Sequence, residues 1–105
     1  MNKKIFALQA DVCKALAHPI RMEIIHLLRE EELCFAKILE ATGCLKSNLS
    51  QHLKIMIDKG VLKVRRDGQC RYYSLLSRKV GQACQLMHEV LFQNIKDQQE
   101  LIKNI

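Results

Sequence analysis

The feature that most constrains the fold is segment 46–73, where a helical pattern with a polar start is followed by a glycine and two β-rich runs. This segment contains seven lysines and arginines and two aspartates, so its balance of plus five supplies most of the formal net charge of plus six. Residues 23–40 instead carry five acids and two bases. Positive charge concentrated on one supersecondary unit is typical of a surface that meets phosphates, so we expect a DNA-binding protein.

Length and composition narrow the class of protein. A chain of 105 residues with one proline and 49% hydrophobic residues favours one small, mainly helical domain spanning residues 1–105. No apolar run approaches the roughly 20 residues of a membrane span, so we expect no membrane partner, and we expect no signal peptide. Five cysteines without a CxxC pair argue against a secreted disulfide framework and favour the reducing cytoplasm.

The order of helical and strand patterns predicts a winged helix-turn-helix fold. The spacing of apolar residues and the proline and glycine boundaries predict five helices, over residues of about 4–17, 19–30, 33–41, 46–59 and 78–103. After Gly60, two β-rich runs flank Asp67-Gly68, a strong hairpin signal that predicts a two-stranded wing over about 61–75. The expected fold class is therefore mainly α with a small β-hairpin, and its helix-turn-helix covers about 33–59.

The second helix of a helix-turn-helix enters the major groove and presents its first residues to base edges. Here that helix begins with small hydroxyl, carboxamide and imidazole side chains, which offer directional donors and acceptors. We expect it to contact DNA through Lys46, Ser47, Asn48, Ser50, Gln51, His52 and Lys54. The wing adds cations near its tip that are expected at the phosphates, namely Arg65, Arg66 and Arg71.

A specific combination of segments lies between residues of about 10 and 76. It consists of residues 16–21, 47–53, 59–62, 65–68 and 72–75, in this order and without gaps. Together these segments resemble the ArsR/SmtB family of winged-helix repressors. The resemblance implies a homodimer that pairs through the first and last helices, about 4–17 and 78–103, and that binds a palindromic operator in double-stranded DNA. It also implies an inducer, often a metal or a thiol-reactive species, that releases the DNA.

The inducer sites known in that family match this sequence only in part. The arsenic-type box has two cysteines at the start of the third helix, whereas here Cys34 is followed by Ala36 at the second position. The last helix offers only His88-Glu89 for a zinc site, and the thiols of the cadmium/lead and persulfide types are not matched. Because thiolates prefer soft metals, the candidate metal site is Cys13 of one chain with Cys34 of the other, for As(III) or another soft ion as inducer.

Other interpretations of the sequence stay open. A winged helix can serve as a protein-interaction module without sequence-specific DNA binding. A repressor of this family can also lack a working metal site and respond to a redox or unknown signal. Cys44, Cys70 and Cys84 are interpreted as packing residues, because cysteine often behaves as a small buried hydrophobe. No paired carboxylates, nucleophile with a base, or phosphate loop indicates an enzyme.

Overall fold

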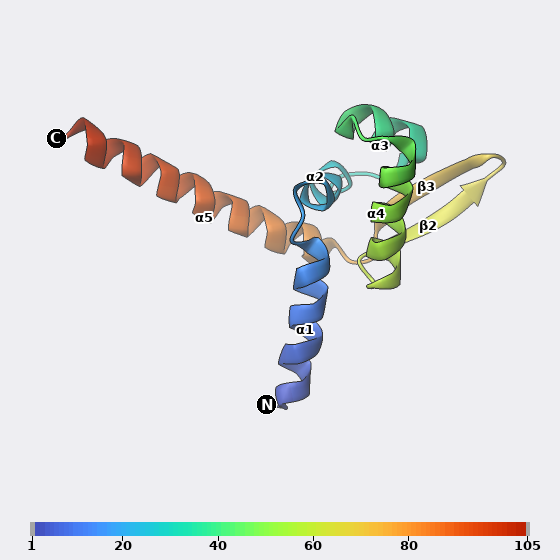
Figure 1. Cartoon of the computed structure of the whole chain (residues 1–105), viewed down its shortest axis with the longest axis horizontal. Helices are drawn as coiled ribbons and strands as arrows, with labels where there is room; N and C mark the ends of the chain where they lie inside the picture. The colour runs from blue at the N-terminus through green and yellow to red at the C-terminus, as the bar shows by residue number, and fades with distance from the viewer. Residues whose placement is uncertain (1, 105) are drawn as a thin grey trace.

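The computed structural model of the chain describes residues 2–104 and arranges them in five helices and three strands (Figure 1). In chain order the elements are α1 (Lys3–Leu16), α2 (Pro19–Leu27), β1 (Leu33–Cys34), α3 (Phe35–Thr42), α4 (Lys46–Asp58), β2 (Leu62–Asp67), β3 (Cys70–Leu75) and α5 (Arg78–Lys103). The five predicted helices and the predicted winged helix-turn-helix architecture are confirmed.

Local sequence signals explain where the central helices begin and end. The backbone N–H of Ile20 donates to Nδ1 of His18 at 3.1 Å, so the imidazole caps α2, and Pro19 occupies its first turn. Gly43 ends α3 in the left-handed conformation with φ of 68°, and its N–H donates to the carbonyl of Leu39. The turn that leads into α4 is therefore short, and it fixes the angle between the two helices of the helix-turn-helix.

The wing is an antiparallel pair of β2 and β3, with Leu62 opposite Leu75 and Asp67 opposite Cys70. The tight turn between them uses Gly68 with φ of 64°, which a side chain rarely tolerates, so the predicted hairpin is confirmed.

The structure corrects the start of the third helix. The predicted helix over 33–41 begins only at Phe35, because Leu33 and Cys34 form the short strand β1. This strand pairs with β3, placing Leu33 opposite Tyr73 and Cys34 opposite Tyr72, and the sheet order is β1-β3-β2. The two wing strands therefore have a third strand at their base, which the sequence analysis did not predict.

One hydrophobic core joins the helix-turn-helix to the base of the wing. Its side chains come from α2, α3, α4 and the sheet, namely Ile24, Ile25, Leu28, Ile38, Leu49, Leu53, Met56, Val61, Leu62 and Tyr73. Half-buried residues of the outer helices pack against this core, among them Leu16 of α1 and Cys84 of α5. The core therefore holds α4 from its inner side and leaves the outer side of that helix in solvent.

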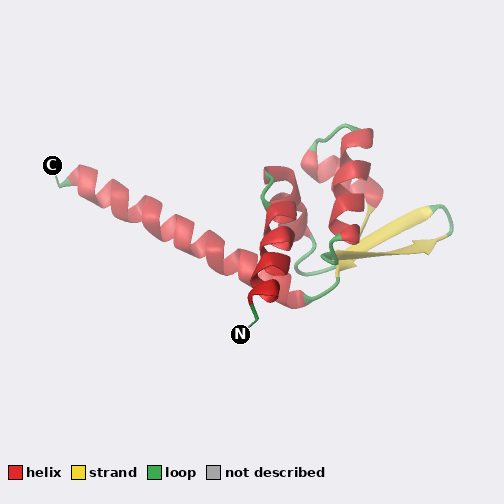
Figure 2. Cartoon of the chain, turned by 60° about the horizontal axis from the view of Figure 1, so that its bottom comes forward, coloured by secondary structure: helices red, strands yellow, loops and turns green. Residues whose placement is uncertain are grey.

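The outer helices α1 and α5 project from this body (Figures 1 and 2). α5 has 26 residues, of which only Gly81 is buried, and it extends far beyond the last helix that it contacts. Large apolar side chains of both helices are exposed, including Phe6 of α1 and Met87 and Leu91 of α5. Among the described residues, no helix combines the length and the apolar character needed to cross a membrane.

Candidate nucleic-acid interface

The exposed face of α4 carries most of the polar side chains that the sequence analysis assigned to DNA. Leu49, Leu53 and Met56 turn one side of the helix into the core. The other side is exposed and presents Lys46, Ser47, Asn48, Ser50, Gln51 and Lys54. This arrangement follows from the helical period, which places residues three and four apart on the same face. The structure thus brings six of the predicted residues onto one accessible surface.

The first turn of α4 has free backbone N–H groups, because no side chain caps the start of this helix. Its N-cap residue is Leu45, which offers no side-chain acceptor to the free backbone N–H groups at the helix start. These groups and the helix dipole favour an anion at that end. Since Lys46 and Ser47 stand at the same end, the start of α4 is suited to a phosphate.

His52 occupies a different position from the other predicted residues of α4. It is half-buried at the edge of the helix that faces α2, and its Nδ1 accepts a hydrogen bond of 3.1 Å from Nε of Arg21. The ring of His18 lies beside it, with the two ring centroids 4.5 Å apart. Burial lowers the pKa of His52, and the nearby charges of His18 and Arg21 lower it further. His52 is therefore a neutral imidazole at neutral pH.

The wing separates its three predicted arginines onto two faces, because successive residues of a strand point to opposite sides. Arg66 and Arg71 are directly opposite each other in the ladder and lie exposed on one face. Like charges in that position destabilise a hairpin, and an anionic partner would relieve their repulsion. Neither arginine of this pair forms an ion pair within the described residues, so both are available to an anion.

Arg65 points to the other face and is already engaged. Its Nε donates to both carboxylate oxygens of Glu32, at 3.1 and 3.0 Å, and its guanidinium carbon lies 4.5 Å from the centroid of the Tyr72 ring. The hydrogen bond from Arg65 lowers the pKa of Glu32. A phosphate that binds Arg65 must therefore compete with this carboxylate. No local pattern indicates this pair, since Glu32 directly precedes the unpredicted strand β1 and is 33 positions from Arg65 in the sequence.

Comparison with known proteins agrees with this geometry. The family described as "Bacterial regulatory protein, arsR family" matches residues 18–64 of the chain. The "Uncharacterized HTH-type transcriptional regulator Rv0081" of Mycobacterium tuberculosis is 30% identical over 105 residues, covering 99% of this chain and 92% of that protein. The chain belongs to the ArsR family. The predicted family is thus confirmed, and so is the expectation that this ArsR-family protein is a transcriptional regulator and no enzyme.

Solved structures and a further relative support the same assignment. The crystal structure of M. tuberculosis Rv0081 has a TM-score of 0.81 and 33% identity, and the match covers 90% of this chain and 95% of that one. A solution NMR structure of a homodimeric winged helix-turn-helix DNA-binding domain, Mb0332 of Mycobacterium bovis, has a TM-score of 0.81 and 27% identity, with 90% and 88% covered. The "Arsenical resistance operon repressor" of Staphylococcus xylosus is 34% identical over 66 residues, or 63% of this chain and 64% of that repressor.

The thiols of this ArsR-family chain are scattered over the fold, with Cys44 directly before the N-cap of α4 and Cys70 in the wing. Cys13 is exposed on α1, and Cys34 is half-buried where β1 meets α3. Within the described part of the chain, no three histidine, cysteine or acidic residues are grouped so that they could hold a metal ion. Burial raises the pKa of Cys84, and the charge of Cys13 raises it further, so the Cys84 thiol is protonated. A single protomer therefore offers no complete soft-metal site among these residues.

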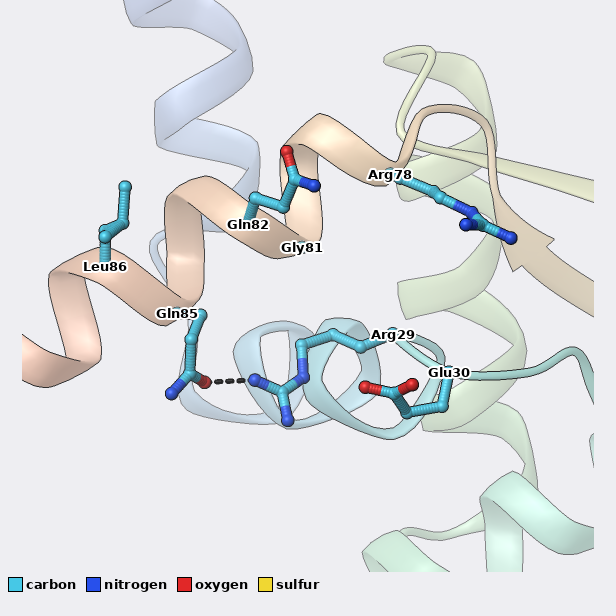
Figure 3. Close-up of a pocket in the computed structure, with 7 residues that line it drawn as sticks. All are labelled: Arg29, Glu30, Arg78, Gly81, Gln82, Gln85 and Leu86. Carbon is cyan, nitrogen blue, oxygen red and sulfur yellow. Dashed lines mark hydrogen bonds between the residues drawn. The ribbon is translucent and has the colours of Figure 1, made fainter.

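A pocket of about 560 Å³ lies where α2 meets the first turns of α5 (Figure 3). Arg29, which follows the end of α2, crosses this joint, and its guanidinium donates a hydrogen bond to Oε1 of Gln85. Gly81 leaves room for the crossing, since an added Cβ would stand 3.0 Å from Cγ of Arg29. Neither α4 nor the wing contributes to the pocket, so Arg29 belongs to the joint with the outer helix and lies outside the DNA-facing surface.

Proposed function

We propose that this ArsR-family regulator is a homodimeric repressor of a palindromic operator and that a soft metalloid or a thiol-reactive compound releases it from DNA. Each protomer would insert the exposed face of α4 into a major groove. The wings would contact the backbone beside it. The inducer would change how the two protomers are oriented relative to each other, and this change would alter the spacing of the two α4 helices.

The observation that carries the DNA-binding role is the pairing of Arg66 with Arg71 beside the polar face of α4. A protein without an anionic partner gains nothing from two arginines directly opposite each other in a hairpin. The uncapped, cation-flanked start of α4 adds a second anion-binding feature on the same structural unit. Both features suit a phosphate backbone, with Ser47, Asn48 and Gln51 available for base edges.

Two substitutions separate the base-reading role from the backbone role. The operator would first be selected from a random duplex library, and binding would then be measured over a range of salt concentrations. Gln51→Ala is expected to reduce the preference for operator over random DNA by roughly 1–3 kcal/mol. Arg66→Ala is expected to weaken both duplexes similarly and to reduce the log–log salt slope by about 0.9. Equal losses on both duplexes for Gln51→Ala would contradict its base-reading role, and absence of any binding at low salt would indicate a protein-interaction module.

The homodimer is supported by the uncovered apolar faces of α1 and α5. Leu86, Met87 and Leu91 of α5 are more than half exposed, as are Phe6 and Leu8 of α1. Contiguous apolar surface of this kind marks an interaction site, and a second copy of the same chain offers an equally apolar surface. The homodimeric M. bovis neighbour named above has the same fold and supports this arrangement.

The inducer part of the proposal depends on thiols from two protomers. Cys13 is exposed on a helix expected at the dimer interface, where it can approach the partner's β1 region, and thiolates are the preferred ligands of As(III) and other soft ions. The test is release of labelled operator by arsenite, cadmium, zinc, polysulfide or peroxide, repeated on Cys13→Ser and Cys34→Ser. Loss of the arsenite response in both variants supports the site. An unchanged response in both rules it out, and a response to peroxide or polysulfide alone indicates a redox signal.

A further inference from the structure

We propose that Arg21 is a positioning residue for DNA recognition, which fixes His52 as the tautomer that carries its proton on Nε2 and so supplies a neutral N–H donor to an acceptor on the operator. This inference rests on the proposed DNA-binding function. It assigns a role to a residue of α2 that lies outside the exposed face of α4. The acceptor is either a base-edge atom or a phosphate oxygen, and the experiment below separates the two.

The position of Arg21 is fixed from two sides. Its Nη1 donates to the carbonyl oxygen of Ala15 at 2.8 Å, in the last turn of α1, where the helix dipole favours a cation. Its Nε donates to Nδ1 of His52 at 3.1 Å. A planar guanidinium held at both nitrogens has little freedom to rotate. The direction of the hydrogen bond to His52 is therefore set by the end of α1.

This hydrogen bond determines the tautomer of His52. Arginine can only donate, so Nδ1 of His52 must be the acceptor and the proton of the neutral ring must be on Nε2. His18 does not compete for Nδ1 of His52, because among the described residues no hydrogen bond joins the two rings, which lie 4.5 Å apart between centroids. The charges of Arg21 and His18 and the burial of the ring all disfavour a second proton on His52. The result is one oriented donor at the edge of α4, next to the exposed residues that face DNA.

A neutral donor makes a different contribution from the lysines and arginines around it. It releases no counterion, so it leaves the salt slope unchanged, and it contributes through a directional hydrogen bond. The loss of that bond is expected to weaken binding by about tenfold. Arg21 would act on DNA only through His52, and this dependence distinguishes positioning from a direct charge contact.

The first measurement needs no DNA. Nitrogen-15 NMR of the imidazole rings in the free protein is expected to show His52 with an unprotonated Nδ1 and a protonated Nε2. In Arg21→Met the ring should become a mixture of tautomers, and the pKa of His52 should rise, because a hydrogen bond to the neutral form and a nearby positive charge are both lost. Arg29→Met is the matched control, since it removes the same charge just after the end of α2, where Arg29 contacts Gln85 of α5 and not His52 (Figure 3). A mixed tautomer in the wild-type protein would overturn the proposal.

The second measurement is a double-mutant cycle on operator and random DNA with Arg21→Met, His52→Ala and the combined variant, with thermal unfolding as a check of the fold. Each single variant is expected to lose about tenfold in affinity, and the combination no more than either alone. A loss confined to the operator indicates a base-edge acceptor, and a similar loss on both duplexes indicates a phosphate.

Additive losses, or a loss for Arg21→Met no larger than that for Arg29→Met, would overturn the positioning role while leaving DNA binding intact. If the wild-type protein binds neither duplex, the proposed function fails and the role of Arg21 in recognition fails with it. The two failures are thus distinguishable by the wild-type measurement alone.

Discussion

The winged core and the two outer helices place their apolar residues in opposite environments. In the core, Ile24, Ile38 and Leu53 are at most 1% exposed. In α5, Met87 and Leu91 are 67% and 56% exposed, although they are four residues apart on one face of the helix, as core residues are. The apolar residues of the core are thus buried within one chain, whereas those of the outer helices stay exposed in the single chain. The two regions depend on different things, the first on its own packing and the second on a partner surface.

Two contacts join the outer helix α1 to α4, the helix proposed to read DNA. Asp11 of α1 forms an ion pair of 2.7 Å with Lys59, the C-cap residue of α4, and Arg21 of α2 joins Ala15 of α1 to His52 of α4. A change in the position of α1 would therefore reach α4 directly. In the proposed dimer, this is a physical route from the partner surface to the helix proposed to read DNA.

The largest effect is expected from a cavity in the core. Leu53→Ala removes a side chain that is 1% exposed on the inner face of α4, and such substitutions cost about 2–5 kcal/mol. Urea unfolding measures the loss. Sedimentation under conditions where the variant stays folded should show the same oligomeric state as the wild type. A change of oligomeric state without loss of stability would contradict the division between the two regions.

A charge on the exposed apolar face of α5 should change the oligomeric state rather than the stability of the core. Leu91→Glu places a carboxylate in the exposed apolar face of α5, so we expect the dimer to dissociate and operator affinity to fall by about a hundredfold, roughly 2.7 kcal/mol. Sedimentation and DNA binding measure the two quantities. Gln82→Glu is the control, because it adds the same charge to an exposed position nine residues before Leu91, on the opposite side of the same helix. Equal behaviour of the two variants would exclude the apolar face as the interface.

The sequence could predict the regions whose signals are local. Segment 46–73 predicted α4 and the wing, because helical spacing, a glycine boundary and Asp67-Gly68 all act over a few residues. The strand β1 could not be found in this way, since two residues show no periodicity and Leu33 and Cys34 are extended only because β3 pairs with them. The correction at the start of α3 follows from the same cause.

The sequence could predict which residues make up the candidate site, but not the long-range hydrogen bonds that join them to the rest of the fold. Side chains on the exposed face of α4 follow from the helical period, so residues such as Ser47 and Gln51 could be assigned from the sequence. The hydrogen bond between Arg21 and His52 joins residues 31 positions apart, and that between Glu32 and Arg65 joins residues 33 positions apart. Such pairs depend on tertiary packing, which no local pattern encodes. From the sequence we therefore expected His52 and Arg65 to contact DNA directly. In the structure His52 is hydrogen-bonded to Arg21, and Arg65 is paired with Glu32.

A smaller effect is expected from freeing a wing arginine. Glu32→Gln removes the carboxylate that Arg65 binds, so Arg65 becomes available to a phosphate and DNA affinity should rise by about threefold, the scale of an exposed ion pair. Anisotropy titrations with random duplex measure the gain. Glu31→Gln is matched in charge and also exposed, and within the described residues Glu31 makes no ion pair. A similar gain for both variants would show that the effect is only one of net charge.

The smallest expected effect is a stability loss between pH 7.5 and 5.5 that originates at His52. Its pKa in the folded protein is below the usual 6.5, so the unfolded chain binds a proton first as the pH falls. Stability is therefore complete above pH 6.5 and declines as the pH falls toward the lowered pKa. Burial of the ring is the main cause of the lowered pKa, and the charges of His18, which precedes α2, and Arg21 on α2 add to it.

Urea unfolding at the two pH values should show a smaller decline for His52→Gln, which keeps a polar side chain but cannot titrate. The ion pairs of Asp11 and Glu32 provide the internal control, because the pKa values of both carboxyl groups are lowered from 3.8 and 4.5. Their contribution is present above those values and is lost only at lower pH, so Glu32→Gln should leave the decline between pH 7.5 and 5.5 unchanged. The opposite result would be a full decline in stability for His52→Gln and no decline for Glu32→Gln. It would show that the loss of stability originates at the ion pair of Glu32 with Arg65 and not at His52.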